Sequence, residues 1–237
     1  YVSVRFRSSL PNQYQAGALV SKGLSALGTE FRAGGFATEN NNINNGFLTY
    51  ISVMATENNT NIVFDDFPTG INIINHTGAT PINANLNEGE SYMIGVGTNY
   101  GGTPNDLIGT LISSDKPIVV NSGSGTGSFA DGSGGRDFGI DQIVGFSKVG
   151  NEYIFVRGNG GGDGSNITPN DGDKWENIII IAHQDNTDVF VNDGTASEAT
   201  LNAGEWVVIE GDGINNNGNG YNSNGNLYVQ TSNPVFA

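Results

Sequence analysis

Asp106-Leu-Ile-Gly-Thr-Leu-Ile-Ser-Ser-Asp-Lys-Pro-Ile-Val-Val-Asn-Ser-Gly123 is the stretch that decides the fold, because a shorter copy of it, Leu227-Tyr-Val-Gln-Thr-Ser-Asn-Pro-Val-Phe-Ala237, recurs at the end of the sequence. In both copies an apolar run leads through Ser or Thr to Pro117 or Pro234, and a second apolar run follows. A proline at the first position of a strand costs no ladder hydrogen bond. Each copy therefore predicts a new β-strand that begins at its proline.

Two further pairs of segments match in the same order. Residues 51–64 (ISVMATENNTNIVF) correspond to residues 178–191 (IIIIAHQDNTDVFV), and residues 85–92 (NLNEGESY) correspond to residues 200–207 (TLNAGEWV). Three matches in one order indicate an internal duplication. We place the first copy near residues 47–122 and the second near 175–237.

Polar turn residues separate the apolar runs. Residues 57–60 (ENNT) and 184–187 (QDNT) stand at matched places, and Asn tolerates the positive φ that tight hairpin turns need. The sequence therefore predicts an all-β fold, an antiparallel β-sandwich-like architecture with an internal duplication and long Gly/Asn-rich loops. The expected order is an N-terminal segment with the first copy (1–122), a loop-rich connection with two strands (123–174) and the second copy (175–237), together one compact unit.

The composition excludes several classes of partner. Nine basic against 24 acidic residues give a net charge of -15, which argues against binding to nucleic acid or to anionic membranes. No run has the length of a membrane-spanning helix, and the absence of cysteine excludes disulfides and thiolate sites. No signal peptide is present and the sequence stops inside an expected strand, so we expect a fragment of a longer chain, with its other domains as partners.

Four stretches carry a resemblance to a known family: residues 21–32 (SKGLSALGTEFR), 51–60 (ISVMATENNT), 109–123 (GTLISSDKPIVVNSG) and 141–145 (DQIVG). Together they resemble the N-terminal domain of the IgG-Fc-binding-protein family, in the version found in large secreted surface proteins and gliding-type adhesins of Bacteroidetes. The resemblance implies an extracellular adhesion or ligand-recognition module at the cell surface and, in the bacterial version, export by type IX secretion. Its motifs are strand and turn signatures, and no residue here carries antibody binding over. The lack of cysteine departs from the disulfide-rich animal members and favours the bacterial setting.

Acidic, glycine-rich loops are candidates for calcium. Short oxygen donors cluster in residues 163–166 (DGSN) and 170–173 (NDGD), and hard cations take six to eight oxygen ligands. Asp163, Asp171 and Asp173 are the predicted ligands. The spacing matches no EF-hand, and solvated turns have the same composition, so they remain the alternative.

Four aromatic residues lie in or beside Gly/Asn-rich loops and are the predicted ligand-binding residues: Tyr100, Phe129, Trp175 and Tyr221. Aromatic faces amid amide and hydroxyl groups suit a surface polysaccharide or a protein ligand. The alternative is that each ring packs under its own loop.

Catalytic motifs are weak. Residues 123–128 (GSGTGS) lack the last glycine of a dinucleotide fingerprint, and no helical pattern follows them. His76 and His183 are isolated, which fits neither a zinc site nor a Ser-His-Asp triad. We therefore expect a non-enzymatic recognition module. The alternative is a polysaccharide-active enzyme or its carbohydrate-binding accessory domain, which as an enzyme needs two carboxylates about 5–10 Å apart across a groove.

Overall fold

The computed structural model describes residues 2–10, 13–37, 48–78, 80–97, 101–103, 105–127, 137–156, 177–211, 213–221 and 225–237. Strands dominate these residues and pair antiparallel, which confirms the predicted all-β fold. They form two compact units, one ending at Lys148 and the other beginning at Val149. The helices found in these ranges are short 3-10 turns, so none meets the length and hydropathy that a membrane-spanning helix requires.

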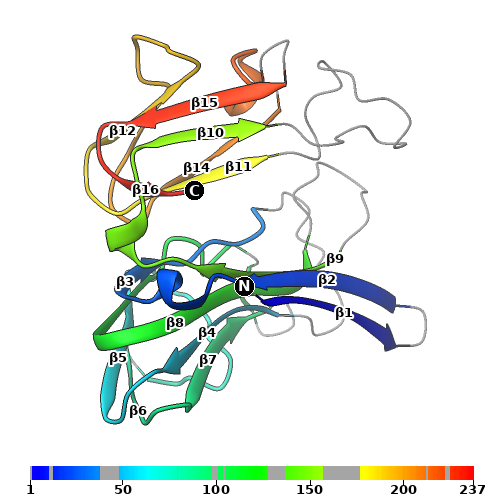
Figure 1. The fold of residues 1–237 in the computed structure, drawn as a ribbon, viewed down its shortest axis with the longest axis vertical. Coiled ribbons are helices and arrows are strands. Elements are labelled where there is room, and N and C mark those ends of the chain that lie inside the picture. Colours follow the sequence, from blue (N-terminus) through cyan, green and yellow to red (C-terminus); the bar gives the residue numbers. More distant parts are fainter. Residues whose placement is uncertain are drawn as a thin grey trace. The chain divides into compact units, whose positions relative to one another are not determined.

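The described residues of the first unit form strands β1 to β9 and the 3-10 helices η1 and η3. Figure 1 shows how these strands are arranged. In chain order they are β1 (Val2–Leu10), β2 (Gln13–Ser21), η1 (Gly23–Ala26), β3 (Gly28–Arg32), β4 (Thr49–Ala55), β5 (Thr60–Asp65), β6 (Ile82–Leu86), β7 (Ser91–Val96), β8 (Leu111–Gly127), β9 (Asp137–Ile143) and η3 (Phe146–Lys148). β1 and β2 form a hairpin, and β2 lies beside β9.

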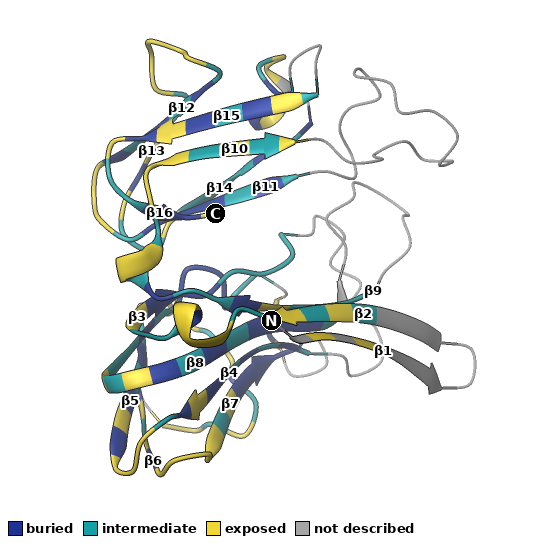
Figure 2. Cartoon of the chain, viewed as in Figure 1, coloured by how far each residue is buried: buried dark blue, intermediate teal, exposed yellow. Residues whose placement is uncertain are grey.

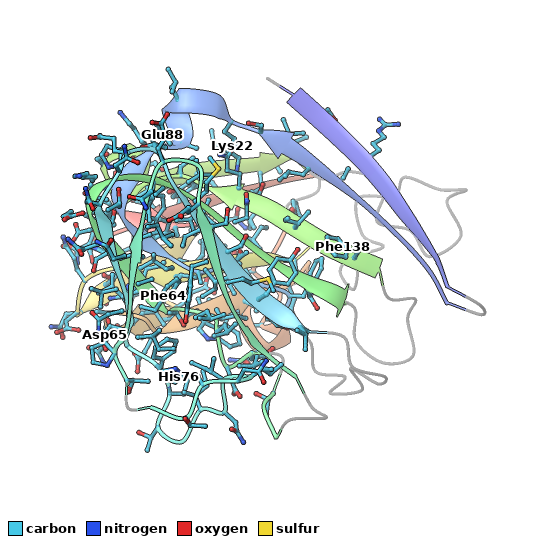
Figure 3. All side chains as sticks on the ribbon, turned by 90° about the horizontal axis from the view of Figure 1, so that it is seen from below. Lys22, Phe64, Asp65, His76, Glu88 and Phe138 are labelled. Carbon is cyan, nitrogen blue, oxygen red and sulfur yellow. The ribbon has the colours of Figure 1, made fainter. Side chains whose placement is uncertain are left out.

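The long strand β8 organises this unit and runs through Pro117 without a break, so the prediction that a new strand begins at this proline was wrong; in the second unit β16 does begin directly after Pro234. Before Pro117 it pairs with β3 and β5, and after Pro117 it pairs with β4 and β9. β6 extends the first group of strands and β7 the second. Apolar side chains of both groups form one buried core, in which Phe64 is fully enclosed while its neighbour Asp65 lies on the other face of β5 (Figure 3).

The second unit repeats this pairing with separate strands. It contains β10 (Glu152–Val156), β11 (Ile178–Ala182), β12 (Thr187–Val191), β13 (Ala199–Leu201), β14 (Trp206–Ile209), η4 (Ile214–Asn216), β15 (Asn226–Thr231) and β16 (Val235–Phe236). The sheet orders are β10-β15-β12-β13 and β14-β11-β16. β15 and β16 flank Pro234 as the two halves of β8 flank Pro117, and a second core of buried residues lies within this unit.

Matched hydrogen bonds show the duplication at atomic detail. Ahead of the prolines, the Ser114 hydroxyl donates to the Lys116 carbonyl at 2.7 Å, and the Thr231 hydroxyl donates to the Asn233 carbonyl at 2.7 Å. After β6 and β13, the amides of the turns donate to the carboxylates of Glu90 and Glu205, both at 2.7 Å. Each of these glutamates closes its own turn in its own unit.

The correspondence extends upstream of the two copies expected from the sequence. Residues 23–31 (GLSALGTEF) match residues 145–153 (GFSKVGNEY), and in both a 3-10 helix precedes a strand. β10 pairs with β15 in the register in which β3 pairs with β8. The two strands expected in the connection 123–174 therefore belong to different units, β9 to the first and β10 to the second.

The glycine-rich residues after Pro117 are part of β8 rather than a loop, which corrects the expectation that a polar loop begins at Gly123. A Cβ on Gly123 would lie 2.3 Å from the Gly139 carbonyl oxygen and 2.8 Å from the Tyr50 hydroxyl. A Cβ on Gly139 would lie 1.9 Å from the ring of Phe36. These glycines make room for aromatic rings and a neighbouring strand.

Candidate functional site

Among the described residues of the second unit, the exposed large apolar side chains lie on the outer face of β10 (Figure 2). Ile154 and Val156 have exposed fractions of 74% and 76%, while Tyr153 and Phe155 alternate with them and pack against the core. The inward rings stack with their centroids 6.1 Å apart. β10 is therefore apolar on both faces, although the solvated face of an antiparallel sheet is usually polar.

Tyr228 continues this surface on the neighbouring strand. It lies directly opposite Ile154 in the β10–β15 ladder and is half-buried. Partial burial, with the charges of Glu152 and Asp193 acting in the same direction, raises the pKa of the Tyr228 hydroxyl. We call the surface formed by Ile154, Val156 and Tyr228, with Glu152 and Asp193 beside it, the Ile154 face.

In the first unit, the position equivalent to Ile154 holds a buried residue that forms an ion pair. Arg32 stands in the register position of Ile154, yet its side chain is only 3% exposed. Its Nη1 donates to the Asp66 carboxylate at 2.7 Å and to the Gly109 carbonyl at 2.9 Å. Asp193 is the counterpart of Asp66, and both have positive φ, but Asp193 forms no ion pair with the described residues. At this position the described residues thus form an apolar surface beside an unneutralised carboxylate in the second unit, and a buried ion pair in the first.

Tyr221 is the one predicted ligand-binding residue that the structure describes. It is half-buried and packs against the core of the second unit, and its amide donates to the Gly211 carbonyl at 2.9 Å. The other six predicted site residues lie outside the described residues: Tyr100, Phe129, Trp175, Asp163, Asp171 and Asp173.

The Gly/Asn-rich segment 213–221 is held by side-chain hydrogen bonds to residues outside it. Asn192 donates to the Asn219 side chain at 3.1 Å and to the Gly220 carbonyl at 2.6 Å, and Asn217 donates to Glu198 at 2.7 Å. A Cβ on Gly220 would lie 2.1 Å from the Gly211 carbonyl oxygen, so glycine is needed there. This segment is a tightly hydrogen-bonded cap of the second core.

Metal and catalytic groups do not converge in the described ranges. No group of three or more His, Asp or Glu side chains there has the geometry of a metal site. His183 packs edge-on against Phe236 with ring centroids 6.0 Å apart, and Glu90 and Glu205 close separate turns.

The exposed residues of the Ile154 face were missed from the sequence. Residues 152–156 (EYIFV) lie in the connection 123–174, for which the sequence predicts two strands but not which side of either strand faces solvent. A signal was present, since an antiparallel strand with one solvated face should alternate polar and apolar residues. Four consecutive apolar residues after Glu152 therefore indicate a second apolar surface.

Comparison of the chain with curated proteins and with solved structures found no match. A family model described as IgGFc binding protein matches residues 17–237, which covers both units from β2 to the end of β16. The chain therefore belongs to the IgGFc binding protein family.

Proposed function

We propose that this chain is a non-enzymatic, extracellular recognition module of a bacterial cell-surface adhesin and that it holds a protein ligand at the Ile154 face. Family membership supports a binding module, since the family is named for binding a protein and is typically extracellular. The absence of cysteine supports the bacterial setting. The resemblance to the bacterial members then implies export by type IX secretion.

The exposure of Ile154 and Val156 carries the proposal. Single exposed apolar residues are ordinary, but two on one strand face beside an exposed edge of Tyr228 form a continuous surface. Burying them under a partner would contribute about 25 cal/mol for each Å² of apolar area removed from water. Glu152 and Asp193 would then select a partner with cationic groups beside its own apolar residues.

The test uses the whole chain and a double variant, Ile154→Ser with Val156→Ser. Both side chains are largely exposed, so the double variant should keep the wild-type melting temperature. We expect the wild type to bind immobilised protein ligands, with IgG Fc as the first probe, and the variant to bind at least tenfold more weakly. Met93→Ser, on the exposed face of β7 in the first unit, is the matched control. Equal binding by wild type and double variant, or binding to surface glycans alone, would contradict a protein site at the Ile154 face.

Calcium binding by Asp163, Asp171 and Asp173 stays a prediction. Thermal unfolding in EDTA and then in added calcium tests it, because a ligand that binds only the folded state raises the melting temperature. An increase that Asp171→Ala and Asp173→Ala abolish would support a calcium site beside the loop aromatics. An unchanged melting temperature would identify these aspartates as residues of solvated turns.

A further inference from the structure

The first unit shows how this fold binds a guanidinium group. Phe31 belongs to the buried core, so Arg32, the next residue of β3, directs its side chain to the opposite face of the strand. There Arg32 Nη1 donates to the Asp66 carboxylate at 2.7 Å and to the Gly109 carbonyl at 2.9 Å. Asp66 directly follows β5 and has a φ of 56°. The receiving carboxylate is therefore carried by a residue in the left-handed region at the end of β5.

The second unit holds a carboxylate at the same place. Asp193, the counterpart of Asp66, has a φ of 58°. The residue before it is bonded twice to Tyr228: the Asn192 amide donates to the Tyr228 carbonyl at 2.9 Å, and the Tyr228 amide donates to Asn192 Oδ1 at 3.2 Å. β5 pairs with β8 at the equivalent position in the first unit. The backbone thus holds Asp193 beside Tyr228 as it holds Asp66 beside β8.

The donor of the first unit has no equivalent among the described residues of the second. Ile154 stands at the register position of the arginine. Asp193 forms no ion pair with the residues that the structure describes. Arg157 and Lys174 are the only basic residues in 149–237, and both lie outside the described ranges. The described part of the second unit therefore contains the acceptor of a guanidinium without its donor.

The groups around Asp193 suit an arginine better than a lysine. Partial burial, and then the charges of Glu152 and Asp193, raise the pKa of the Tyr228 hydroxyl, so both carboxylates lie near this ring. A planar guanidinium can stack on an aromatic face while it donates to a carboxylate, whereas an ammonium is a point charge. The aliphatic stem of the arginine can lie along Ile154, which is directly opposite Tyr228.

We propose that the Ile154 face binds an arginine side chain of the partner protein, whose guanidinium pairs with Asp193 and stacks on Tyr228. The first unit supplies its own arginine at this position, and the second receives one from the partner. This inference rests on the proposed function, since it names the group by which the protein ligand is held. Exposed ion pairs contribute little by themselves, so stacking on the ring and burial of Ile154 and Val156 supply the rest of the affinity.

A blocked tripeptide, Val-Arg-Val, is the probe for this site. Its matched controls are Val-Lys-Val, which keeps the charge, and Val-citrulline-Val, which keeps the planar shape without the charge. We expect the arginine peptide to shift the NMR signals of the Asp193, Tyr228 and Ile154 amides in the isotope-labelled whole chain. The lysine peptide should bind several-fold more weakly and the citrulline peptide not measurably. The lysine control is needed because a chain with a net charge of -15 attracts any cation.

Three variants test the residues that hold the arginine. Asp193→Asn should weaken binding of the arginine peptide about tenfold, because a hydrogen bond to a charged group is lost. Tyr228→Leu introduces the residue of the first unit, Leu111, and should weaken binding several-fold through loss of the ring. Ile154→Arg should prevent binding, because the new side chain reaches Asp193 as Arg32 reaches its own aspartate. Met93→Arg adds the same charge on the exposed face of β7 and should leave binding unchanged.

Three results would overturn the inference. One is equal affinity for the arginine and lysine peptides that Asp193→Asn leaves unchanged. Another is binding that Ile154→Arg retains. The third is binding that appears only in Arg157→Gln, since the chain would then supply its own arginine to Asp193.

Failure of the proposed function looks different from failure of this inference. If Ile154→Ser with Val156→Ser abolishes binding of the protein ligand but Asp193→Asn does not, the face binds a protein without an arginine contact, and only the inference is wrong. If the double variant binds the protein ligand as the wild type does, while the arginine peptide still shifts the Asp193 amide, the arginine site exists and the proposed protein site is wrong.

Discussion

Arg32 in the first unit and Ile154 in the second occupy equivalent positions in the duplicated set of strands, and a comparison of the two shows where the units differ. In the first unit the place holds a buried guanidinium bound to Asp66 and Gly109. In the second it holds an exposed aliphatic side chain beside Asp193, which no described cation neutralises. One hydrogen bond at each proline bend and one in each turn that follows β6 or β13 are the same in both units. Strand pairing is thus the conserved property of the duplication, and the outer surface is the part that changed.

The largest expected effect concerns the independence of the two units. Phe64 is fully buried in the first core, so Phe64→Ala should lower the free energy of unfolding of that unit by about 3–5 kcal/mol. Both tryptophans, Trp175 and Trp206, belong to residues 149–237 and report on the second unit. In urea, the early part of the unfolding transition followed by circular dichroism should shift to lower urea concentration. The midpoint followed by tryptophan fluorescence, which reports on the second unit, should stay the same.

Val191→Ala, at the matched position of the second core, is the reciprocal control and should move the fluorescence midpoint alone. If Phe64→Ala moves both signals together, the chain unfolds as the one compact unit that the sequence suggested, and the separation into two units is structural but not energetic.

The repeated apolar runs and the turn residues predicted the strands and hairpins well, because both depend on residues that are close together in the sequence. The break predicted at a proline is present at Pro234, between β15 and β16, but not at Pro117, which lies inside β8. The ENNT and QDNT turns are hairpins with Asn59 and Asn186 at positive φ, as predicted. The residues that decide the outer surface were not predictable in this way. Whether the position after Phe31 or Tyr153 is buried depends on Asp66 and Gly109, which come from distant strands and connections. A candidate site defined by loop composition fell largely on residues 100, 129 and 157–176, outside the described ranges.

Converting the first unit toward the second should have the next largest effect. Arg32→Ile removes two hydrogen bonds from a charged donor and leaves the Gly109 carbonyl without its partner. We expect a loss of about 1.5–3 kcal/mol in the free energy of unfolding of the first unit. The lower part of this range is expected because Asp66 is 45% exposed and water can replace its partner.

Asp66→Asn is the matched variant for that ion pair. It keeps an acceptor oxygen and leaves the bond from Arg32 to Gly109 intact, so its cost should be smaller. Urea unfolding followed by circular dichroism measures both. An Arg32→Ile protein as stable as the wild type would show that the ion pair between Arg32 and Asp66 does not stabilise the first unit.

The reverse conversion should change stability little. Ile154→Arg places a cation near Asp193, but the site is largely exposed, and exposed ion pairs contribute about 0.2–1 kcal/mol. The fluorescence midpoint in urea should rise slightly at low salt, and the gain should disappear at about 1 M NaCl. A large gain that persists at high salt would mean that the second unit retains the closed geometry of the first.

The smallest effect lies at the proline bend, where Asp115 in the first unit stands in the place of Ser232 in the second. Asp115 accepts bonds from the side-chain amide of Asn61 at 2.7 Å and from its backbone amide at 2.8 Å, whereas Ser232 accepts one backbone bond from Asp188 at 2.9 Å. The bond from the Asn61 side chain is the main cause that lowers the pKa of Asp115 below its usual 3.8. A carboxyl whose pKa is lower in the folded state stabilises that state above pH 3.8, and this contribution is lost as the pH falls through the folded value.

Carbon-13 NMR titration should therefore give an Asp115 pKa under 3.8, and Asn61→Ala should raise this pKa. Asp115→Ser should make the free energy of unfolding of the first unit less sensitive to pH below about pH 3.8. Because Ser232 does not titrate, the second unit should lack this component already. A wild-type Asp115 pKa at or above 3.8 would show that the aspartate is exchangeable with serine at this bend, and that the two copies differ there in sequence but not in energetics.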